Sequence, residues 1–153
     1  MNIYRIKKSN IDRKGHGLYA IKDIKEGTRI LDYVGNIITK KQTDENPKFD
    51  NGKAIYLYNL NNKYDLDGDF KYNTARLINH SCNPNCEVEG KGLKLWISSI
   101  KDIKKGDELS YDYGFSFDKD FRDFPCKCRS KNCCGFIVRE GSRWRLKKKK
   151  TSK

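Results

Sequence analysis

The residues best suited to chemistry lie in one short stretch of the chain, RLINHSCNPNC at residues 76–86. It places an amide, an imidazole and two thiols close together, at Asn79, His80, Cys82 and Cys86. The Asn-Pro pair inside it predicts a turn, because the residue before a proline is disfavoured in a helix. The stretch therefore predicts either a loop that binds a ligand or takes part in catalysis, or a capped turn with two buried thiols.

Three further cysteines form the pattern CxCxxxxC at Cys126, Cys128 and Cys133. Three thiols at this spacing can converge on one tetrahedral ion, but a structural zinc site needs four ligands. The cysteine directly after Cys133 is a poor fourth ligand, because adjacent side chains seldom reach the same metal. The fourth ligand is then Cys82 or Cys86. The alternatives are unrelated reduced thiols or the disulfides of a secreted protein, and the clustered spacing argues against both.

The size and composition indicate one domain with a heavily charged surface. The chain has 153 residues, of which 36% are hydrophobic and 35% charged, and this length suffices for a single core. No run approaches the roughly 20 apolar residues of a membrane span. The N-terminus lacks an apolar segment of signal-peptide length. We therefore expect a soluble protein that stays inside a cell and does not contact a membrane.

The positive charge is concentrated near the C-terminus. The net charge is +13, and residues 139–153 hold eight Lys or Arg and one Glu, a balance of +7. Such a run is either a solvated tail or a segment that attracts nucleic acid or chromatin without reading sequence. It can also serve as a nuclear address.

The pattern of apolar residues predicts a mainly β architecture with short helices. Turn signals are frequent, and a pair of glycines in GHGLYA, residues 15–20, predicts a hairpin turn or a loop that approaches a ligand. Thr39 and Gln42 have the spacing of a capping box, so a short helix is expected to run to about residue 46. The expected strands and loop are a strand within 3–14, a strand at 29–34, a loop at 47–53, and strands at 54–60 and 93–100.

Four separated motifs occur in an order that identifies a family. GHGLYA, RLINHSCNPNC, ELSYDYGF and CKCRSKNCCGFI together resemble the SET-domain protein lysine methyltransferases that carry a post-SET zinc motif, in the chromatin-associated branch that acts on histone tails. The resemblance covers roughly residues 3–140. It implies small curved β-sheets with a knot-like crossing of the chain. It also implies three parts: a SET domain at 1–120, a post-SET zinc-binding segment at 121–140 and a basic tail at 141–153.

The resemblance also implies roles for individual residues. Tyr113 aligns with the catalytic tyrosine, Tyr56 with a tyrosine of the lysine channel, and Tyr111 with a position that controls how many methyl groups are added. S-adenosylmethionine is the implied methyl donor, and zinc is the implied structural metal. The implied cofactor-binding residues are Gly15, His16, Gly17, Arg76, Asn79 and His80. The implied zinc ligands are Cys82, Cys126, Cys128 and Cys133.

The sequence departs from the family pattern at several positions, none of which removes a residue that the chemistry requires. Arg129 stands where a glycine is frequent, so the turn between the zinc-binding cysteines is expected to differ. Cys134 stands where an arginine is common, which removes a charge beside the metal. The other departures are His16, Asn36 and Leu77.

The implied function is methyl transfer to a lysine of a histone tail or nucleosome, mainly as mono- or dimethylation. The expected location is the nucleus, or the host nucleus if the source is a bacterium or virus, with non-specific DNA contact through the basic tail. Two alternatives remain open: methylation of a non-histone protein, and a catalytically inactive SET module that binds chromatin or nucleic acid.

Overall fold

The structure, a computed structural model, describes residues 2–50 and 56–147. These residues form ten short strands and a few short helices, which confirms the predicted mainly β architecture. The strands are β1 Tyr4–Lys8, β2 His16–Ala20, β3 Arg29–Tyr33, β4 Asn36–Thr39, β5 Leu57–Asn59, β6 Tyr64–Asp67, β7 Asn79–His80, β8 Cys86–Lys91, β9 Lys94–Ser99 and β10 Ser110–Tyr111. The helices are α1 Lys40–Glu45 and α2 Trp144–Lys147, with 3-10 turns η1 Pro47–Phe49, η2 Thr74–Leu77, η3 Phe121–Asp123 and η4 Glu140–Ser142.

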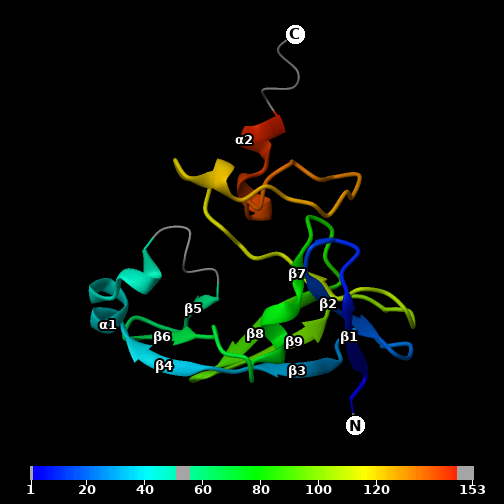
Figure 1. The fold of residues 1–153 in the computed structure, drawn as a ribbon, viewed down its shortest axis with the longest axis horizontal. Coiled ribbons are helices and arrows are strands. Elements are labelled where there is room, and N and C mark those ends of the chain that lie inside the picture. Colours follow the sequence, from blue (N-terminus) through cyan, green and yellow to red (C-terminus); the bar gives the residue numbers. More distant parts are fainter. Residues whose placement is uncertain (1, 51–55, 148–153) are drawn as a thin grey trace.

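The strands assemble into four small sheets rather than one large one. The hairpin β1–β2 is antiparallel, and the two three-stranded sheets have the orders β3-β9-β8 and β4-β6-β5. The fourth sheet is the parallel pair β7–β10. Figure 1 shows the sheets together in one part of the molecule, with the C-terminal segment in orange and red forming a separate layer over β7. The threading of one segment beneath another stays a prediction.

Most expected elements occur close to their predicted positions. The expected strand within 3–14 is β1, and the strands expected at 29–34 and 93–100 are β3 and β9. The capping box is confirmed: the Thr39 hydroxyl accepts from the Gln42 amide, and the Gln42 side chain accepts from the Thr39 amide.

Two expected segments differ in part. Residues 47–49 form η1 and not a loop, because Pro47 suits the first turn of a helix and the Asn46 side chain accepts from the Lys48 amide. The strand expected at 54–60 is limited to β5 among the described residues. Residues 54 and 55, and the part of the loop at 51–53, lie outside the described residues.

The core lies where the sheets face one another. Leu18 of β2, Ile97 of β9 and Leu109 before β10 are fully buried, and together with Ile78 they join three sheets into one cluster. These apolar contacts provide the rigid base on which the polar residues in and directly after β7 and β10 are held. Within the described ranges, no helix combines the length and the apolar character needed to cross a bilayer.

Candidate active site and metal centre

The parallel pair β7–β10 brings two distant motifs side by side. Asn79 pairs with Ser110, His80 pairs with Tyr111, and the Ser81 amide donates to the Tyr111 carbonyl at 3.2 Å. Two-residue strands are weak by themselves. Asn85 supports this pair: its side chain donates to the Glu108 carbonyl and accepts from the Ser110 amide, both at 2.9 Å.

Glu108 links the N-terminal loop to this strand pair. Its carboxylate accepts from the Ser9 hydroxyl at 2.6 Å and from the Asn79 side chain at 3.1 Å. The Asn79 amide also donates to the carbonyl oxygen of His16 at 2.9 Å. A Cβ atom at residue 17 would lie 2.2 Å from the Glu108 carboxylate, so only Gly17 allows this close approach.

His80 is held as a neutral ring. Burial lowers its pKa to about 4, an effect that nearby Asp112 opposes and the guanidinium of Arg143 reinforces. His80 Nδ1 and the Asp112 carboxylate lie 3.7 Å apart, but they do not form an ion pair near neutral pH because the ring is uncharged. His80 Nδ1 instead accepts from the Tyr113 amide at 3.1 Å, which leaves Nε2 as the protonated nitrogen, 3.7 Å from the sulfur of Cys82.

Tyr113 lies at the edge of a cleft of about 280 Å³. Its hydroxyl donates to the Ile78 carbonyl at 2.6 Å, and burial raises the pKa of this hydroxyl, so it stays protonated. Other side chains supply carboxylate, amide, imidazole and apolar surface. The cleft is lined by Ile11, Asp12, Tyr56, Asn79, His80, Tyr113, Asp123, Phe124, Pro125, Cys126, Lys127 and Ile137.

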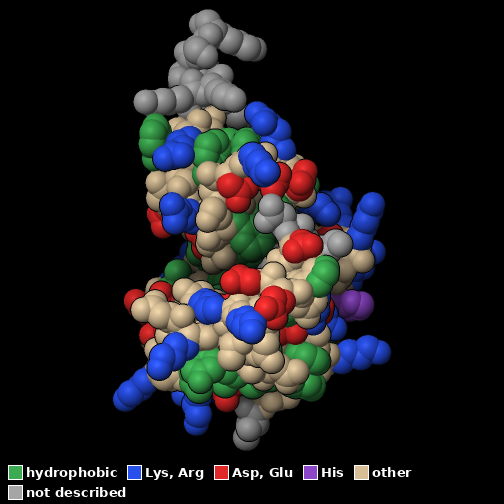
Figure 2. Space-filling view, turned by 90° about the vertical axis from the view of Figure 1, so that its left-hand side faces the viewer, with side chains coloured by type: hydrophobic (Ala, Val, Ile, Leu, Met, Phe, Trp, Pro, Cys, Tyr) green, Lys and Arg blue, Asp and Glu red, His purple; other side chains and the backbone are tan. Residues whose placement is uncertain are grey.

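A second cleft, of about 270 Å³, meets the first at Tyr113. It lies between β5 and residues 113–116, and Tyr58 and Phe115 are among its walls. Figure 2 shows the molecule hollowed between its upper, C-terminal part and the part that carries the sheets, with hydrophobic side chains inside the hollow. Tyr113 is thus a lining residue of both clefts.

Further tyrosines pack behind and beside Tyr113. The rings of Tyr111 and Tyr113 are 4.9 Å apart, and Tyr33 and Tyr58 form an edge-to-face pair at 4.8 Å. Tyr111 is 4% exposed and hydrogen-bonds the Tyr58 side chain, and burial raises the pKa of both hydroxyls. This packing gives a set of protonated tyrosine hydroxyls inside an aromatic environment.

The structure brings some of the sequence-predicted residues together and leaves others apart. Tyr56, Asn79, His80 and Tyr113 share the first cleft. Gly15, His16, Gly17 and Arg76 are not among its lining residues. His16 and Gly17 lie next to the Asn79 side chain, and Gly15 lies next to Asp12. The guanidinium of Arg76 lies 5.8 Å from the centre of the Tyr56 ring and donates to the Phe70 carbonyl. Their contact with a cofactor stays a prediction.

Several residues of the site were missed by sequence reasoning. Asn85 and Glu108 lie within the motifs RLINHSCNPNC and ELSYDYGF, but no role was predicted for them, because each acts through a partner far away in sequence. Tyr58 and Asp12 lie outside the four motifs. Phe124 offered a signal, because it stands two residues before Cys126 and has to follow that cysteine into the site.

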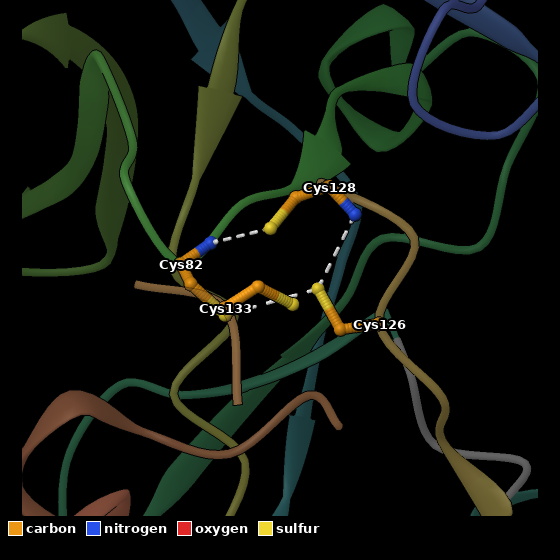
Figure 3. A group of neighbouring side chains, drawn as sticks. All are labelled: Cys82, Cys126, Cys128 and Cys133. Atoms are coloured by element: carbon orange, nitrogen blue, oxygen red, sulfur yellow. Dashed lines mark hydrogen bonds between the residues drawn. The ribbon is translucent and has the colours of Figure 1, made fainter. Parts of the chain in front are cut away.

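Four thiols converge beside the first cleft. The sulfur atoms of Cys82, Cys126, Cys128 and Cys133 all lie within 4.8 Å of one another and point toward a common centre (Figure 3). Zn–S bonds of about 2.3 Å would place the sulfurs of a tetrahedral site about 3.8 Å apart, and Cys82 and Cys126 are separated by 3.8 Å. Backbone amides of Cys82, Cys128 and Gly135 donate to sulfur atoms of the cluster, as expected for thiolates. This donor set fits zinc.

The other two cysteines do not belong to the cluster. Cys86 is buried in the core, where burial raises its pKa to about 12. Cys134 points away and donates to the Phe136 carbonyl at 3.2 Å. All six cysteines lie in the described part of the chain, and each is a free thiol there.

Within the cluster, Cys128 is the most acidic thiol. Burial raises its pKa, but hydrogen bonds from the Ser130 hydroxyl and the Cys82 amide outweigh burial and bring the value to about 6. For Cys82, burial dominates and raises the pKa to about 12.

The turn between Cys128 and Cys133 keeps a glycine-like backbone. Arg129 has φ of 57°, in the left-handed region that glycine adopts without strain. Its guanidinium donates to the Asn10 carbonyl on the N-terminal loop, a contact that favours this conformation. The expectation that the turn differs from that of the family stays a prediction.

Comparison with known proteins identifies the architecture. Residues 15–114 match the family model described as the SET domain. The chain is 39% identical over 126 residues to Histone-lysine N-methyltransferase 2D of Homo sapiens, covering 78% of the chain and 2% of the relative. It is 35% identical over 126 residues to Histone-lysine N-methyltransferase trr of Drosophila melanogaster, covering 78% and 5%. It is 34% identical over 132 residues to Histone-lysine N-methyltransferase ASHH2 of Arabidopsis thaliana, covering 82% and 8%. The chain thus spans only a small part of the length of these relatives.

We predict that iodoacetamide modifies Cys128 first when the protein has been treated with a chelator and the reaction is run at pH 7. A pKa of about 6 leaves roughly nine in ten of these thiols ionised at pH 7. Because the thiolate reacts, the rate should fall about tenfold from pH 7 to pH 5. Mass spectrometry of tryptic peptides measures the rate. Ser130→Ala should slow the reaction by removing the hydroxyl donor, and a rate that does not change over this pH range would contradict the assignment.

Proposed function

Because the chain belongs to the SET domain family, we propose that it is a protein lysine N-methyltransferase that takes its methyl group from S-adenosylmethionine and acts on a histone tail. The observation that carries the proposal is the position of Tyr113, a residue that lines two clefts at once. An enzyme that transfers a group between two substrates needs a place where the two reacting atoms meet, and two clefts that share one residue provide it.

The first cleft has the chemical character needed for the cofactor. S-adenosylmethionine, when bound, would supply an electrophilic methyl group on a positively charged sulfur, together with an adenine ring. The carboxylate of Asp12 complements a cation, and Asn79 and His80 offer hydrogen-bonding groups. Phe124 and Ile137 provide apolar surface for a ring. The strand with Gly15, His16 and Gly17 would support this side through the bond between Asn79 and His16.

The second cleft suits a lysine side chain that has to react as a neutral amine. A lysine with a pKa of about 10.4 is neutral in only about one in 2,500 molecules at pH 7. Desolvation between tyrosine rings favours the neutral form. The Tyr113 hydroxyl donates to the Ile78 carbonyl, and we propose that these two oxygens orient methyl and amine groups by weak C–H···O contacts.

The number of methyl groups is proposed to depend on Tyr111. Its hydroxyl lies next to that of Tyr58, so two polar groups occupy the space behind Tyr113. Together they can hold a water molecule close to the target nitrogen and limit the room for further methyl groups. We therefore propose mainly mono- and dimethylation.

The metal centre is proposed to be a structural zinc held by the four clustered cysteines. Cys82 follows β7, whereas the other three belong to the segment after residue 120. The metal would therefore hold the wall that contains Phe124 against the part of the site that contains His80. This division supports a SET domain at 1–120 followed by a post-SET segment at 121–140.

The histone substrate and a chromatin location are proposed from the names of the relatives, which are histone-lysine N-methyltransferases. A positively charged chain suits acidic chromatin, because nucleic acid attracts basic segments without sequence readout. Residues 148–153 of the basic tail lie outside the described residues. Arg143 has to be removed from the tail, because its side chain is buried and paired with Asp112, and this is a correction to its assignment from sequence.

The activity is tested by methyl transfer to nucleosomes and histone peptides. Tyr113→Phe should lower the rate at least a hundredfold, because it removes the oxygen shared by both clefts. Tyr72→Phe is the matched control, since this exposed tyrosine stacks on Phe70 outside both clefts. Transfer rates are measured with labelled cofactor, and the methylated lysine is located by mass spectrometry. A Tyr113 variant as active as the Tyr72 variant, or wild-type protein that methylates no lysine, would contradict the proposal.

Product distribution tests the role of Tyr111. Tyr111→Phe should shift the products toward di- and trimethyl-lysine, because the loss of the hydroxyl releases the space near the target nitrogen. The measurement is mass spectrometry of one peptide at long reaction times, with Tyr72→Phe as the control. Abundant trimethyl-lysine from the wild-type protein would refute the switch.

Elemental analysis tests the metal. Purified protein should contain about one zinc per chain, and Cys133→Ser should lose it because only three thiols remain. Cys134→Ser is the matched control at the adjacent position: its hydroxyl can still donate to the Phe136 carbonyl, so zinc should be retained. Equal zinc content in the two variants would rule out Cys133 as a ligand.

A further inference from the structure

Arg143 is a buried charge that neither the clefts nor the cysteine cluster explains. It precedes α2, and its residue is 6% exposed. Its guanidinium donates to the Val138 carbonyl at 2.9 Å, to the Cys82 carbonyl at 2.9 Å and to the Asp112 carboxylate at 2.8 Å. One side chain thus connects three segments that are remote from one another in sequence.

A buried guanidinium is costly unless it is fully paired. Here the cost is offset by three hydrogen bonds from the charged guanidinium, of which the one to Asp112 is also an ion pair. The planar fork of arginine can reach acceptors in different directions, whereas a lysine ammonium acts as a compact point charge. The arrangement therefore requires arginine at this position and fixes the relative placement of its three acceptors.

One acceptor is tied directly to the proposed catalytic tyrosines. Asp112 stands between Tyr111 and Tyr113, and alternation along an extended chain points its carboxylate away from their rings. Asp112 Oδ2 also accepts from the Glu140 amide at 3.2 Å, and Oδ1 accepts from the Gly114 amide at 2.9 Å. Holding Asp112 therefore restricts rotation of the backbone that carries both rings.

The second acceptor ties Arg143 to the metal centre. The Cys82 carbonyl receives hydrogen bonds from Arg143 and from the Asn132 side chain, both at 2.9 Å. Asn132 directly precedes Cys133, so the same carbonyl is held by the C-terminal segment and by the turn of the cysteine cluster. Cys82 is in turn two residues from His80, which lines the first cleft.

We propose that Arg143 is a positioning residue for the transfer site: it clamps the backbone of residues 111–113 and the chain after His80 in the geometry that the two clefts need. The inference rests on the proposed function. It assigns a role to the C-terminal segment, residues 138–147. This segment positions the tyrosines through Asp112 and does not contact the substrate.

The test compares Arg143→Met with Arg145→Met in the full chain. Arg145 is the matched control, because it lies two residues further along the same segment and is exposed, with its guanidinium near the rings of Phe117 and Trp144. Arg143→Met should lower kcat for a lysine peptide at least tenfold, with the peptide KM changed less than twofold. Arg143→Lys should recover only part of kcat. Arg145→Met should behave as wild type. Unchanged kcat in Arg143→Met would overturn the proposal.

A double-variant cycle separates positioning from general stabilisation. If Arg143 acts through Asp112, then Arg143→Met combined with Asp112→Asn should cost no more kcat than the worse single variant. Losses that multiply would show that the two residues act independently and would overturn the clamp. All rates are measured well below the unfolding temperature of each variant, so that loss of folded protein does not enter kcat.

Hydrogen–deuterium exchange provides a readout that needs no methyl transfer. Amides at residues 80–83 and 111–114 should exchange at least several-fold faster in Arg143→Met than in Arg145→Met, because the clamp no longer holds them. Equal exchange would overturn the proposal. If the wild-type protein methylates no lysine, the proposed function fails, whereas faster exchange confined to these segments still supports the clamp.

Discussion

The parallel contact between Asn79–His80 and Ser110–Tyr111 is the interaction on which the rest of the site depends. It is only two residues long on each side, and strands of this length do not hold together without help. Hydrogen bonds from neighbouring side chains to the backbone and to Asn79 stabilise the contact. Asn85 completes the pairing on one side, the Tyr113 hydroxyl donates to the carbonyl that precedes β7, and Glu108 connects Asn79 to the N-terminal loop. A small number of hydrogen bonds thus determines whether the polar residues of two motifs face the same cleft.

The C-terminal segment contributes to the same contact from the opposite direction. Its cysteines converge with Cys82, and Arg143 holds the carbonyl of that same residue together with Asp112. With the proposed zinc, Cys82 would be held at both its sulfur and its carbonyl. A residue held in this way could not move without disturbing His80, so the cysteine cluster and the cleft would be mechanically linked even though the metal has no part in the proposed reaction.

Burial keeps the ionisable groups at the centre of the site uncharged, and hydrogen bonds orient them. Burial raises the pKa of the Tyr113 hydroxyl, so this group remains a neutral donor to Ile78 and does not act as a base. Burial also keeps His80 neutral. A site with neutral side chains at its centre suits a reaction in which the nucleophile must itself be neutral, because an additional positive charge would oppose the approach of a cation.

The sequence by itself determined the β-rich class, the capping box at Thr39, the motifs of the site and the membership of the cysteines at 126, 128 and 133. These features are local, because they depend on residue types at short spacing. Spacing alone left Cys82 and Cys86 open as the distant member of the cluster, and the family resemblance implied Cys82. The tertiary structure shows the reason: Cys82 follows β7 and faces the cluster, whereas Cys86 turns into the core. Tertiary structure also decided that Arg143 is buried and not exposed. In sequence it belongs to a basic run that resembles a solvated tail, and nothing nearby marks it. Its burial depends on three acceptors at residues 82, 112 and 138, two of which come close to it only when the chain has folded.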